Sequence, residues 1–245
     1  MKCSFSTTCV SLGPGDAELI TLKALRALRD ADAIFCPATQ LGERSASRAR
    51  DILLEIGIDE RKVHLFCVPM SKERQQAVKV YADVASEIGA RYQQGERIAF
   101  VAEGASVLYS SVHYISDLLA QQGVPVQHVA GVPAFIACGA LAGIHVAKQN
   151  EPLVIYPANV SSETIAADLQ SGRSVVLMKL PQQEEAARAV IGALPNAQFH
   201  YFENVGVAGK EFYTCSAKAI LARTFPYFSV IIIRGGAVHS PSNTQ

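Results

Sequence analysis

The hydrophobic positions of this sequence follow two patterns that replace each other along the chain. Short apolar runs predict strands, and between them apolar positions recur at helical spacing, as in Glu18–Ala31 and Ser71–Gln94. The predicted strands are Phe5–Leu12, Ala33–Cys36 (ended by Pro37), Val63–Val68, Arg97–Ala102, Val124–Ala130, Pro152–Ile155, Ser174–Leu180, Gln198–Glu203 and Phe228–Arg234. Such alternation predicts an α/β fold.

The composition changes near residues 121–131, where a stretch rich in glycine, alanine and proline begins. We therefore predict two α/β domains, residues 1–125 and 126–245. Within the first, Asp16 is the expected N-cap of helix Glu18–Ala31, whose leucines at positions 19, 22, 25 and 28 form one stripe. A helix at about Val107–Gln122 would place Tyr109 and His113 on one face, as a solvated or packed pair rather than a proton relay.

Composition excludes several classes of function. The chain has 245 residues with 22 Lys plus Arg and 22 Asp plus Glu, and it lacks tryptophan, so neither charge nor stacking favours nucleic acid or a membrane surface. Six cysteines are scattered without a C-x-x-C pair, so we expect thiols rather than a metal site.

The expected location is cytoplasmic. The start, MKCSFSTTCVSLG, lacks the apolar run of a signal peptide, and the most apolar segment, Val230–Ile233, is too short to span a membrane.

Three turns made of small residues follow predicted strands: SLGPGD at Ser11–Asp16, EGAS at Glu103–Ser106, and AGVPA at Ala130–Ala134. Such turns at the carboxyl ends of strands are where open α/β sheets bind ligands. They match neither the dinucleotide nor the P-loop fingerprint. Taken singly, SLGPGD is equally compatible with an ordinary strand-to-helix turn. The alternative for the second turn is also a plain strand-to-helix connection, and for the third it is core packing.

Taken together and in order, the three turns resemble the tetrapyrrole methylases, which transfer methyl from S-adenosylmethionine to corrin and sirohaem precursors. GPGDAELITLKALRALRDADAIFCP is similar to the leading signature of that family, and HVAGVPAF is similar to a later one. The segment VHLFCVPMSKERQQAVKVYADVASEI resembles the branch that methylates C20 of precorrin-2 or cobalt-precorrin-2.

The resemblance implies a homodimer that holds S-adenosylmethionine in a cleft between its two domains, with no protein-bound metal. It implies that ten residues contact the cofactor. These are Pro14, Gly104, Ala105, Leu108, Ser110, Ser111, Pro133, Ala134, Met178 and Val205. Small residues suit this chemistry, because a sulfonium is already activated and the protein's main task is alignment, which contributes about 7–11 kcal/mol.

The sequence departs from the family at two positions. The second loop of relatives usually carries an aspartate where this chain has Ala105, so Glu103 is the best remaining acid for removing the C20 proton. Asn204 stands where relatives often have an arginine after the glutamate. The missing aspartate leaves three alternatives open: it is dispensable, Glu103 substitutes for it, or activity is reduced or lost.

The tetrapyrrole substrate of this branch carries several carboxylates, and basic side chains near the motifs are candidates to bind them. These candidates are Arg44, Arg48, Lys72, Arg74 and Lys179. Two alternatives stay open: another methylase of the superfamily, acting at C11 or C17 or resembling diphthine synthase, and a relative that binds cofactor or tetrapyrrole without catalysis.

Overall fold

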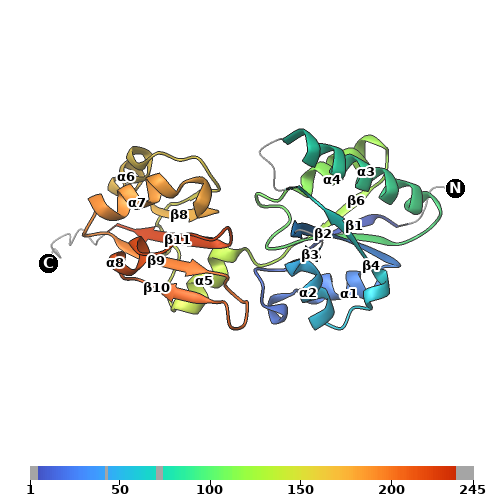
Figure 1. Ribbon diagram of the computed structural model, residues 1–245, viewed down its shortest axis with the longest axis horizontal. Helices are drawn as coiled ribbons and strands as arrows, with labels where there is room; N and C mark the ends of the chain where they lie inside the picture. The colour runs from blue at the N-terminus through green and yellow to red at the C-terminus, as the bar shows by residue number, and fades with distance from the viewer. Residues whose placement is uncertain (1–4, 42–43, 70–73, 236–245) are drawn as a thin grey trace. The chain divides into compact units, whose positions relative to one another are not determined.

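The computed structural model describes residues 5–41, 44–69 and 74–235, which form two units that each contain a β-sheet with helices (Figure 1). The α/β class is thereby confirmed. Contacts divide the chain into Met1–Ala134 and Phe135–Gln245. The sequence placed this boundary at residue 125, before a strand. That strand, β6 (Val126–Val129), pairs with β1 (Thr7–Ser11) and so belongs to the first unit.

In the described part of the first unit the sheet has six strands, in the order β3-β2-β5-β1-β6, with β4 also paired to β2. The remaining strands are β2 (Ala33–Leu41), β3 (Arg44–Ala46), β4 (Val63–Cys67) and β5 (Ile98–Ala102). Strands β4, β2, β5, β1 and β6 run parallel. Consequently the loops that follow β1, β5 and β6 all leave the sheet on the side where the strands have their carboxyl ends.

Helices cover both faces of this sheet, α1 (Leu22–Asp30) and α2 (Arg48–Glu55) on one side, α3 (Arg74–Gln93) and α4 (His113–Gln121) on the other (Figure 1). Side chains of β5 alternate between the two cores: Phe100 packs with α3 and α4, whereas Val101 packs with α1 and α2. The same alternation directs Glu103, the first residue after β5, toward α2.

The first helix begins later than the sequence predicted. Asp16 accepts a hydrogen bond from the Glu18 N–H and caps a short 3₁₀ turn, Ala17–Leu19, while the Thr21 side chain caps α1. The expected leucine stripe is therefore wrong in part, since Leu22 is 71% exposed and Ala24 shares the buried face with Leu28.

Strand β2 does not end at Pro37, as the sequence predicted, but continues to Leu41. Along a strand the N–H and C=O of successive residues point to opposite sides. The Ala38 oxygen accepts from Val68 beside β4, whereas the Pro37 oxygen accepts from the Ser47 hydroxyl. Pro37 thus points away from β4, where its missing N–H leaves no gap in the ladder.

The predicted helix at Val107–Gln122 is shorter in the structure, because α4 begins only at His113. Tyr109 lies in the preceding loop with φ of 51°, so the expected helical pairing of Tyr109 with His113 is wrong. The His113 ring instead lies 4.0 Å from that of Tyr114, centroid to centroid.

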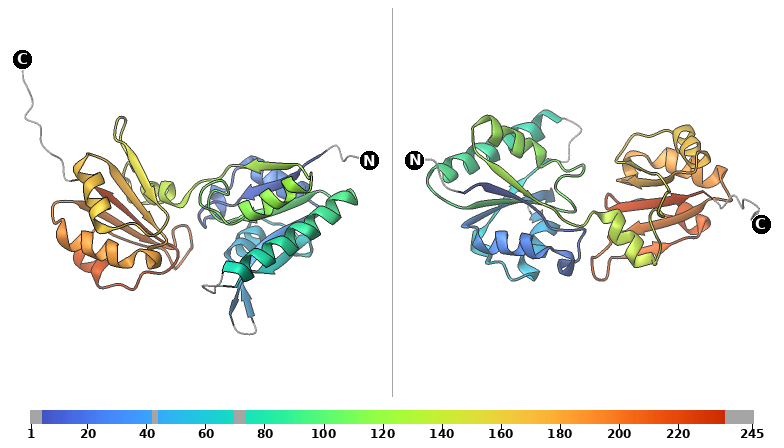
Figure 2. Two further views of the ribbon diagram at one scale, coloured as in Figure 1. Left: turned by 90° about the horizontal axis from the view of Figure 1, so that it is seen from above. Right: turned by 180° about the vertical axis from the view of Figure 1, so that it is seen from behind.

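The second unit holds a sheet whose described strands follow the order β10-β9-β11-β8-β7, seen from further sides in Figure 2. Its strands are β7 (Leu153–Tyr156), β8 (Ser174–Met178), β9 (Gln198–Glu203), β10 (Phe212–Thr214) and β11 (Ser229–Arg234), and its helices are α5 (Ala134–Ala142, beginning at the boundary residue), α6 (Ser162–Gln170), α7 (Glu184–Ala193) and α8 (Ala217–Leu221). Ile165, Val190 and Ile220 of α6, α7 and α8 pack on one face against Tyr201 and Ile231. Strands β7, β8 and β9 therefore end at a common edge, since β7 is parallel to β8, and β11 is antiparallel to both β8 and β9.

Candidate functional site

The first and second loops are joined through their backbones at the carboxyl edge of the first sheet. The Gly13 N–H donates to the Gly104 oxygen at 3.1 Å, and the Gly104 N–H donates to the Gly13 oxygen at 2.6 Å. Both glycines have positive φ, 81° and 70°, a region that side-chain-bearing residues rarely adopt. These two hydrogen bonds between Gly13 and Gly104 keep the first and second loops side by side beyond the paired strands β1 and β5.

Two buried serines reinforce this joint. The Ser11 hydroxyl donates to Oγ of Ser106 at 2.9 Å and accepts from the Ser106 N–H at 2.8 Å. The third loop packs against the same point: a Cβ at Gly131 would lie 2.5 Å from the Ser11 Cβ and 3.1 Å from the Gly104 oxygen. Only glycine allows that approach, so the three loops predicted from sequence meet in the structure.

The second loop leaves space beside the Cα of Gly104. A Cβ built at Gly104 would meet no described heavy atom within 4 Å, whereas one at Gly131 would collide. A side chain at position 104 would therefore fill an opening that the glycine leaves. The lack of a side chain at position 104 lets a partner approach the backbone of this loop closely.

Glu103 lies at the start of this loop with its carboxylate toward α2. Its Oε2 is buried and accepts no hydrogen bond from the described residues, and it lies 3.9 Å from Nε of Arg48. Burial raises the pKa of Glu103 above its ordinary value; the Arg48 guanidinium and the Ala49 N–H lower it, and Asp51 raises it. A carboxylate with a raised pKa is a stronger proton acceptor than that of an ordinary glutamate.

Arg48 also reaches the first loop, because its Nη2 donates to the Pro14 oxygen at 2.9 Å. Pro14 itself is buried. Of the basic residues proposed for substrate carboxylates, Arg48 is thus engaged with the protein's own loops.

The rest of the second loop leads into α4. Leu108 and Ser110 are partly exposed, and the Ser110 oxygen contacts Nδ1 of His113 at 2.9 Å. The Ser111 hydroxyl accepts a hydrogen bond from Tyr81 at 2.8 Å. Tyr81 belongs to α3 and is 5% exposed, so the predicted cofactor residue Ser111 is held by a buried side chain of that helix.

The third loop carries Pro133 and Ala134, both partly exposed. The Thr21 hydroxyl, which caps α1, contacts the Ala130 oxygen at 3.4 Å. Eight of the ten predicted cofactor residues therefore belong to loops of the first unit: Pro14, Gly104, Ala105, Leu108, Ser110, Ser111, Pro133 and Ala134.

The other two predicted cofactor residues belong to the second unit. Met178 ends β8, and Val205 follows β9 at the same edge of that sheet. The Gln183 amide donates to the Met178 oxygen at 2.5 Å and to the Tyr156 oxygen at 3.2 Å, tying the ends of β8 and β7 together. Their joint role with the loops of the first unit stays a prediction.

Asn204, where relatives often have an arginine, follows a glutamate that is paired with Arg223. Glu203, just before it, is 6% exposed and is held by the Arg223 guanidinium through two hydrogen bonds, one of them 2.8 Å long, with Tyr201 donating at 2.5 Å. Arg223 thus supplies Glu203 with a guanidinium from another part of the chain.

Other candidates for carboxylate binding are less defined. Lys179 has φ of 51°, and burial lowers the pKa of its ammonium group. Lys72 and the side chains of Arg44 and Arg74 lie outside the described residues.

Sequence reasoning missed Ser11, Ser106 and Tyr81 as parts of the site. Ser11 and Ser106 stand at the ends of two of the predicted turns, and a small polar residue at this position is a signal that could have identified them. Tyr81 carried no such signal, because it occupies one of the apolar positions of a long helix.

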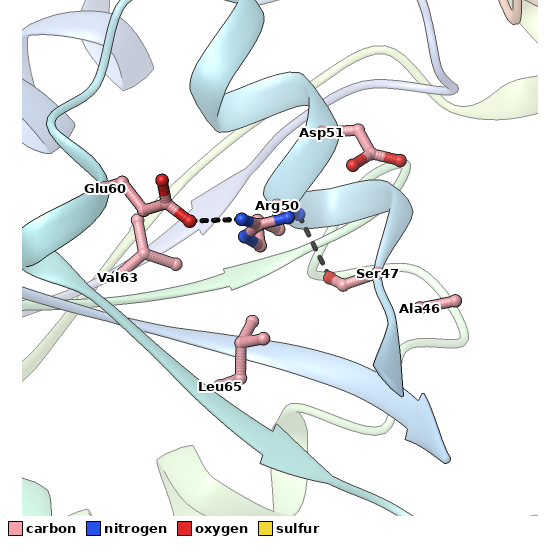
Figure 3. A pocket seen from close by; sticks show the side chains of 7 residues that line it. All are labelled: Ala46, Ser47, Arg50, Asp51, Glu60, Val63 and Leu65. Atoms are coloured by element: carbon pink, nitrogen blue, oxygen red, sulfur yellow. Dashed lines mark hydrogen bonds and ion pairs between the residues drawn. The ribbon is translucent and has the colours of Figure 1, made fainter. Parts of the chain in front are cut away.

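A separate cavity of about 510 Å³ lies beside α2 (Figure 3). It is lined by Ala46, Ser47, Arg50, Asp51, Glu60, Val63 and Leu65. Arg50 pairs there with Glu60. None of the ten predicted cofactor residues lines this cavity, so it is distinct from the candidate site.

Within 5–41, 44–69 and 74–235, no group of three or more His, Cys, Asp or Glu side chains is placed to hold a metal ion. In the same ranges no helix combines the length and the hydrophobicity that crossing a membrane requires.

The fold and the order of these loops define a class of protein. A model of the tetrapyrrole (corrin/porphyrin) methylases matches residues 7–221, and the chain belongs to that family. The family resemblance of the sequence is thus confirmed.

Two relatives within the family resemble this chain over most of its length. The chain is 29% identical over 231 residues to the cobalt-precorrin-2 C(20)-methyltransferase of Salmonella typhimurium, covering 91% of this chain and 94% of the relative. It is 25% identical over 236 residues to the precorrin-2 C(20)-methyltransferase of a Sinorhizobium species, covering 92% and 94%. Among solved structures, a cobalt precorrin-4 methyltransferase has the same fold, with a TM-score of 0.69, 16% identity and 94% of each chain covered.

Proposed function

We propose that this protein transfers a methyl group from S-adenosylmethionine to C20 of precorrin-2 or cobalt-precorrin-2 in cobalamin biosynthesis. The observation that carries the proposal is similarity over nine tenths of the chain to two relatives named for methylation at C20. The three joined loops at the carboxyl ends of the strands support it, because they bring the small residues of the motifs together and leave space beside the Cα of Gly104.

The residues present fit the cofactor. S-adenosylmethionine, when bound, supplies a methyl group on an activated sulfonium. The backbone of Gly104 and Ala105 would hold its methionine part, with Leu108, Ser110 and Ser111 beside it. Pro14, Pro133 and Ala134 would border it, and Met178 with Val205 would contact the adenosine side. Small residues allow this close approach and exclude water from the reacting atoms.

Glu103 would accept the proton that leaves C20 after methylation. Glu103 comes directly after β5 and precedes Gly104 in the second loop, and burial raises the pKa of its carboxyl group. Metal ligation by the protein forms no part of this proposal, since any cobalt would arrive within the substrate.

Homodimerisation and a cytoplasmic location complete the proposal. The dimer is carried over from the family resemblance, and sedimentation equilibrium of the purified chain measures it. A mass of one chain at micromolar concentration contradicts it.

The decisive experiment is a pair of incubations with S-adenosylmethionine, one with precorrin-2 and one with cobalt-precorrin-2, followed by mass analysis for one added methyl group. Fragmentation of the product identifies C20 as the site of methylation. Methylation at C11 or C17 supports a different member of the family. Binding of S-adenosylhomocysteine by calorimetry without methyl transfer to either substrate supports a non-catalytic binder.

A further inference from the structure

Arg48 contacts both of the loops that hold most of the predicted cofactor residues. One guanidinium nitrogen donates to the Pro14 oxygen of the first loop at 2.9 Å, and Nε lies 3.9 Å from the Glu103 carboxylate that opens the second loop. The Arg48 side chain is 18% exposed, so these contacts are screened by water less than those of a surface ion pair. One side chain of α2 therefore connects two loops that are far apart in sequence.

The surroundings of Glu103 offer little else that favours a charged carboxylate. On α2, the Ala49 N–H donates toward it, while Asp51 opposes its ionisation. On β2, the Cys36 thiol lies near enough to interact with Glu103, but burial raises the pKa of that thiol to about 12 and keeps it neutral. Of the described groups that act on Glu103, Arg48 is the one that carries a positive charge.

We infer that Arg48 is a positioning residue that joins the first loop to the second and holds Glu103 as an anion. The inference rests on the proposed function, in which Glu103 accepts a proton and must therefore be ionised beforehand. Arginine suits both tasks because its planar fork can serve two acceptors at once, whereas lysine offers a single point charge.

Three variants of the full chain test this. Arg48→Gln removes the charge and the fork, and Arg48→Lys keeps the charge but not the fork. Arg50→Gln is the matched control, because Arg50 lies two residues along the same helix and pairs with Glu60 beside the separate cavity (Figure 3). Circular dichroism and thermal unfolding establish that each variant folds.

The first measurement is the pKa of the Glu103 carboxyl group, followed by NMR of protein labelled with ¹³C-glutamate and assigned with Glu103→Gln. We expect Arg48→Gln to raise this pKa by about one unit, since an opposite charge at this distance typically lowers a carboxyl pKa by about 1–3 units. Arg48→Lys and Arg50→Gln should leave it close to the wild-type value. An unchanged pKa in Arg48→Gln overturns the role in holding the anion.

The second measurement is the affinity for S-adenosylhomocysteine by calorimetry. Both Arg48 variants should bind it about fivefold more weakly, the equivalent of one hydrogen bond of about 1 kcal/mol. Glutamine at this position is shorter than arginine and loses the bond to Pro14, and a lysine ammonium that stays beside Glu103 does not also serve the Pro14 oxygen. Arg50→Gln should bind like the wild type. Equal affinities in all four proteins overturn the role in joining the loops. If Arg48→Gln does not fold, Arg48→Lys still decides this point, and its pKa must stay near that of the wild type.

These outcomes are separable from the fate of the proposed function. Neither measurement requires methyl transfer, so a wild-type protein that fails to methylate precorrin-2 contradicts the function and leaves both readouts valid. A wild-type protein that fails to bind S-adenosylhomocysteine contradicts the cofactor assignment, and the NMR measurement then decides the inference.

Discussion

At the scale of single residues, Glu103 combines proximity to the second loop with a carboxyl pKa that burial raises. Because the proposed base works as a carboxylate, the methylation rate should fall as the pH is lowered through that pKa. The acidic limb should therefore lie at higher pH than for an ordinary glutamate. We expect Glu103→Gln to lose this limb and to lower kcat at least about 100-fold, the smaller end of what a general base contributes.

The measurement is single-turnover formation of the methylated product by mass spectrometry between pH 5 and pH 9. The control is S-adenosylhomocysteine affinity, which should change less than about twofold, the difference expected when a base is lost and binding is kept. Wild-type turnover in Glu103→Gln would sink the assignment of Glu103 and indicate that the reaction needs no base at this loop.

Gly131 supports a second prediction at residue scale. Alanine there would place a Cβ 2.5 Å from the Ser11 Cβ, where neither backbone can yield without opening the joint between the loops. We expect Gly131→Ala to destabilise the protein by about 1–3 kcal/mol, as overpacking does. Gly192→Ala is the control, because a Cβ in that helix meets no described atom within 4 Å, and it should stabilise by about 0.5–1 kcal/mol. Urea unfolding measures both, and a Gly131→Ala protein as stable as the wild type contradicts this account.

At the scale of elements, α3 supports the second loop through Tyr81. The Tyr81 hydroxyl donates to Ser111, and its ring stacks on Tyr114 with centroids 5.4 Å apart. Tyr92 is a matched control on the same helix, because its hydroxyl donates to the Phe5 oxygen at 3.0 Å. We expect Tyr81→Phe and Tyr92→Phe each to lose about 1 kcal/mol of stability.

Only Tyr81→Phe should alter cofactor binding, because only that hydroxyl contacts a predicted cofactor residue. An increase of about threefold in the dissociation constant of S-adenosylhomocysteine is expected, from the part of that hydrogen-bond energy which orders the loop. Calorimetry on both variants checks it. Equal affinities would show that α3 stabilises the fold without acting on the loop.

The elements also show how far the sequence could predict the fold. Strand β9 matches its predicted bounds, because an alternation of apolar residues marks its limits. Strand β3 and strand β10 were missed, since each has three residues and becomes a strand only through its partner. Pro37 misled the prediction of β2 because the direction of its missing N–H depends on which neighbours pair with it.

The candidate site was also predictable from the sequence only in part. The three loops could be predicted, because small residues at strand ends have a local signature. The contacts that connect the loops could not, since Arg48 and Tyr81 come from helices whose register on the sheet is set by tertiary packing. Ser11 and Ser106 are 95 positions apart, and no local pattern announces their hydrogen bond.

At the scale of the whole molecule, the predicted cofactor residues are shared by two units that have separate sheets. If one S-adenosylhomocysteine molecule contacts both groups, its binding should slow amide exchange in two sets of peptides. The first set covers the loops at 11–16, 103–111 and 130–134, and the second covers the strand ends at 178–183 and 203–209.

Hydrogen–deuterium exchange with mass spectrometry measures this protection. With ligand at about 100 times Kd, binding stabilises the closed state of these segments by up to about 2.7 kcal/mol. Peptides of α6 are an internal reference, because that helix carries no predicted contact.

Met178→Ala should weaken binding and reduce protection in both sets at a fixed ligand concentration. Protection confined to the first unit would contradict the roles of Met178 and Val205 and would leave the cofactor to the loops of the first sheet alone.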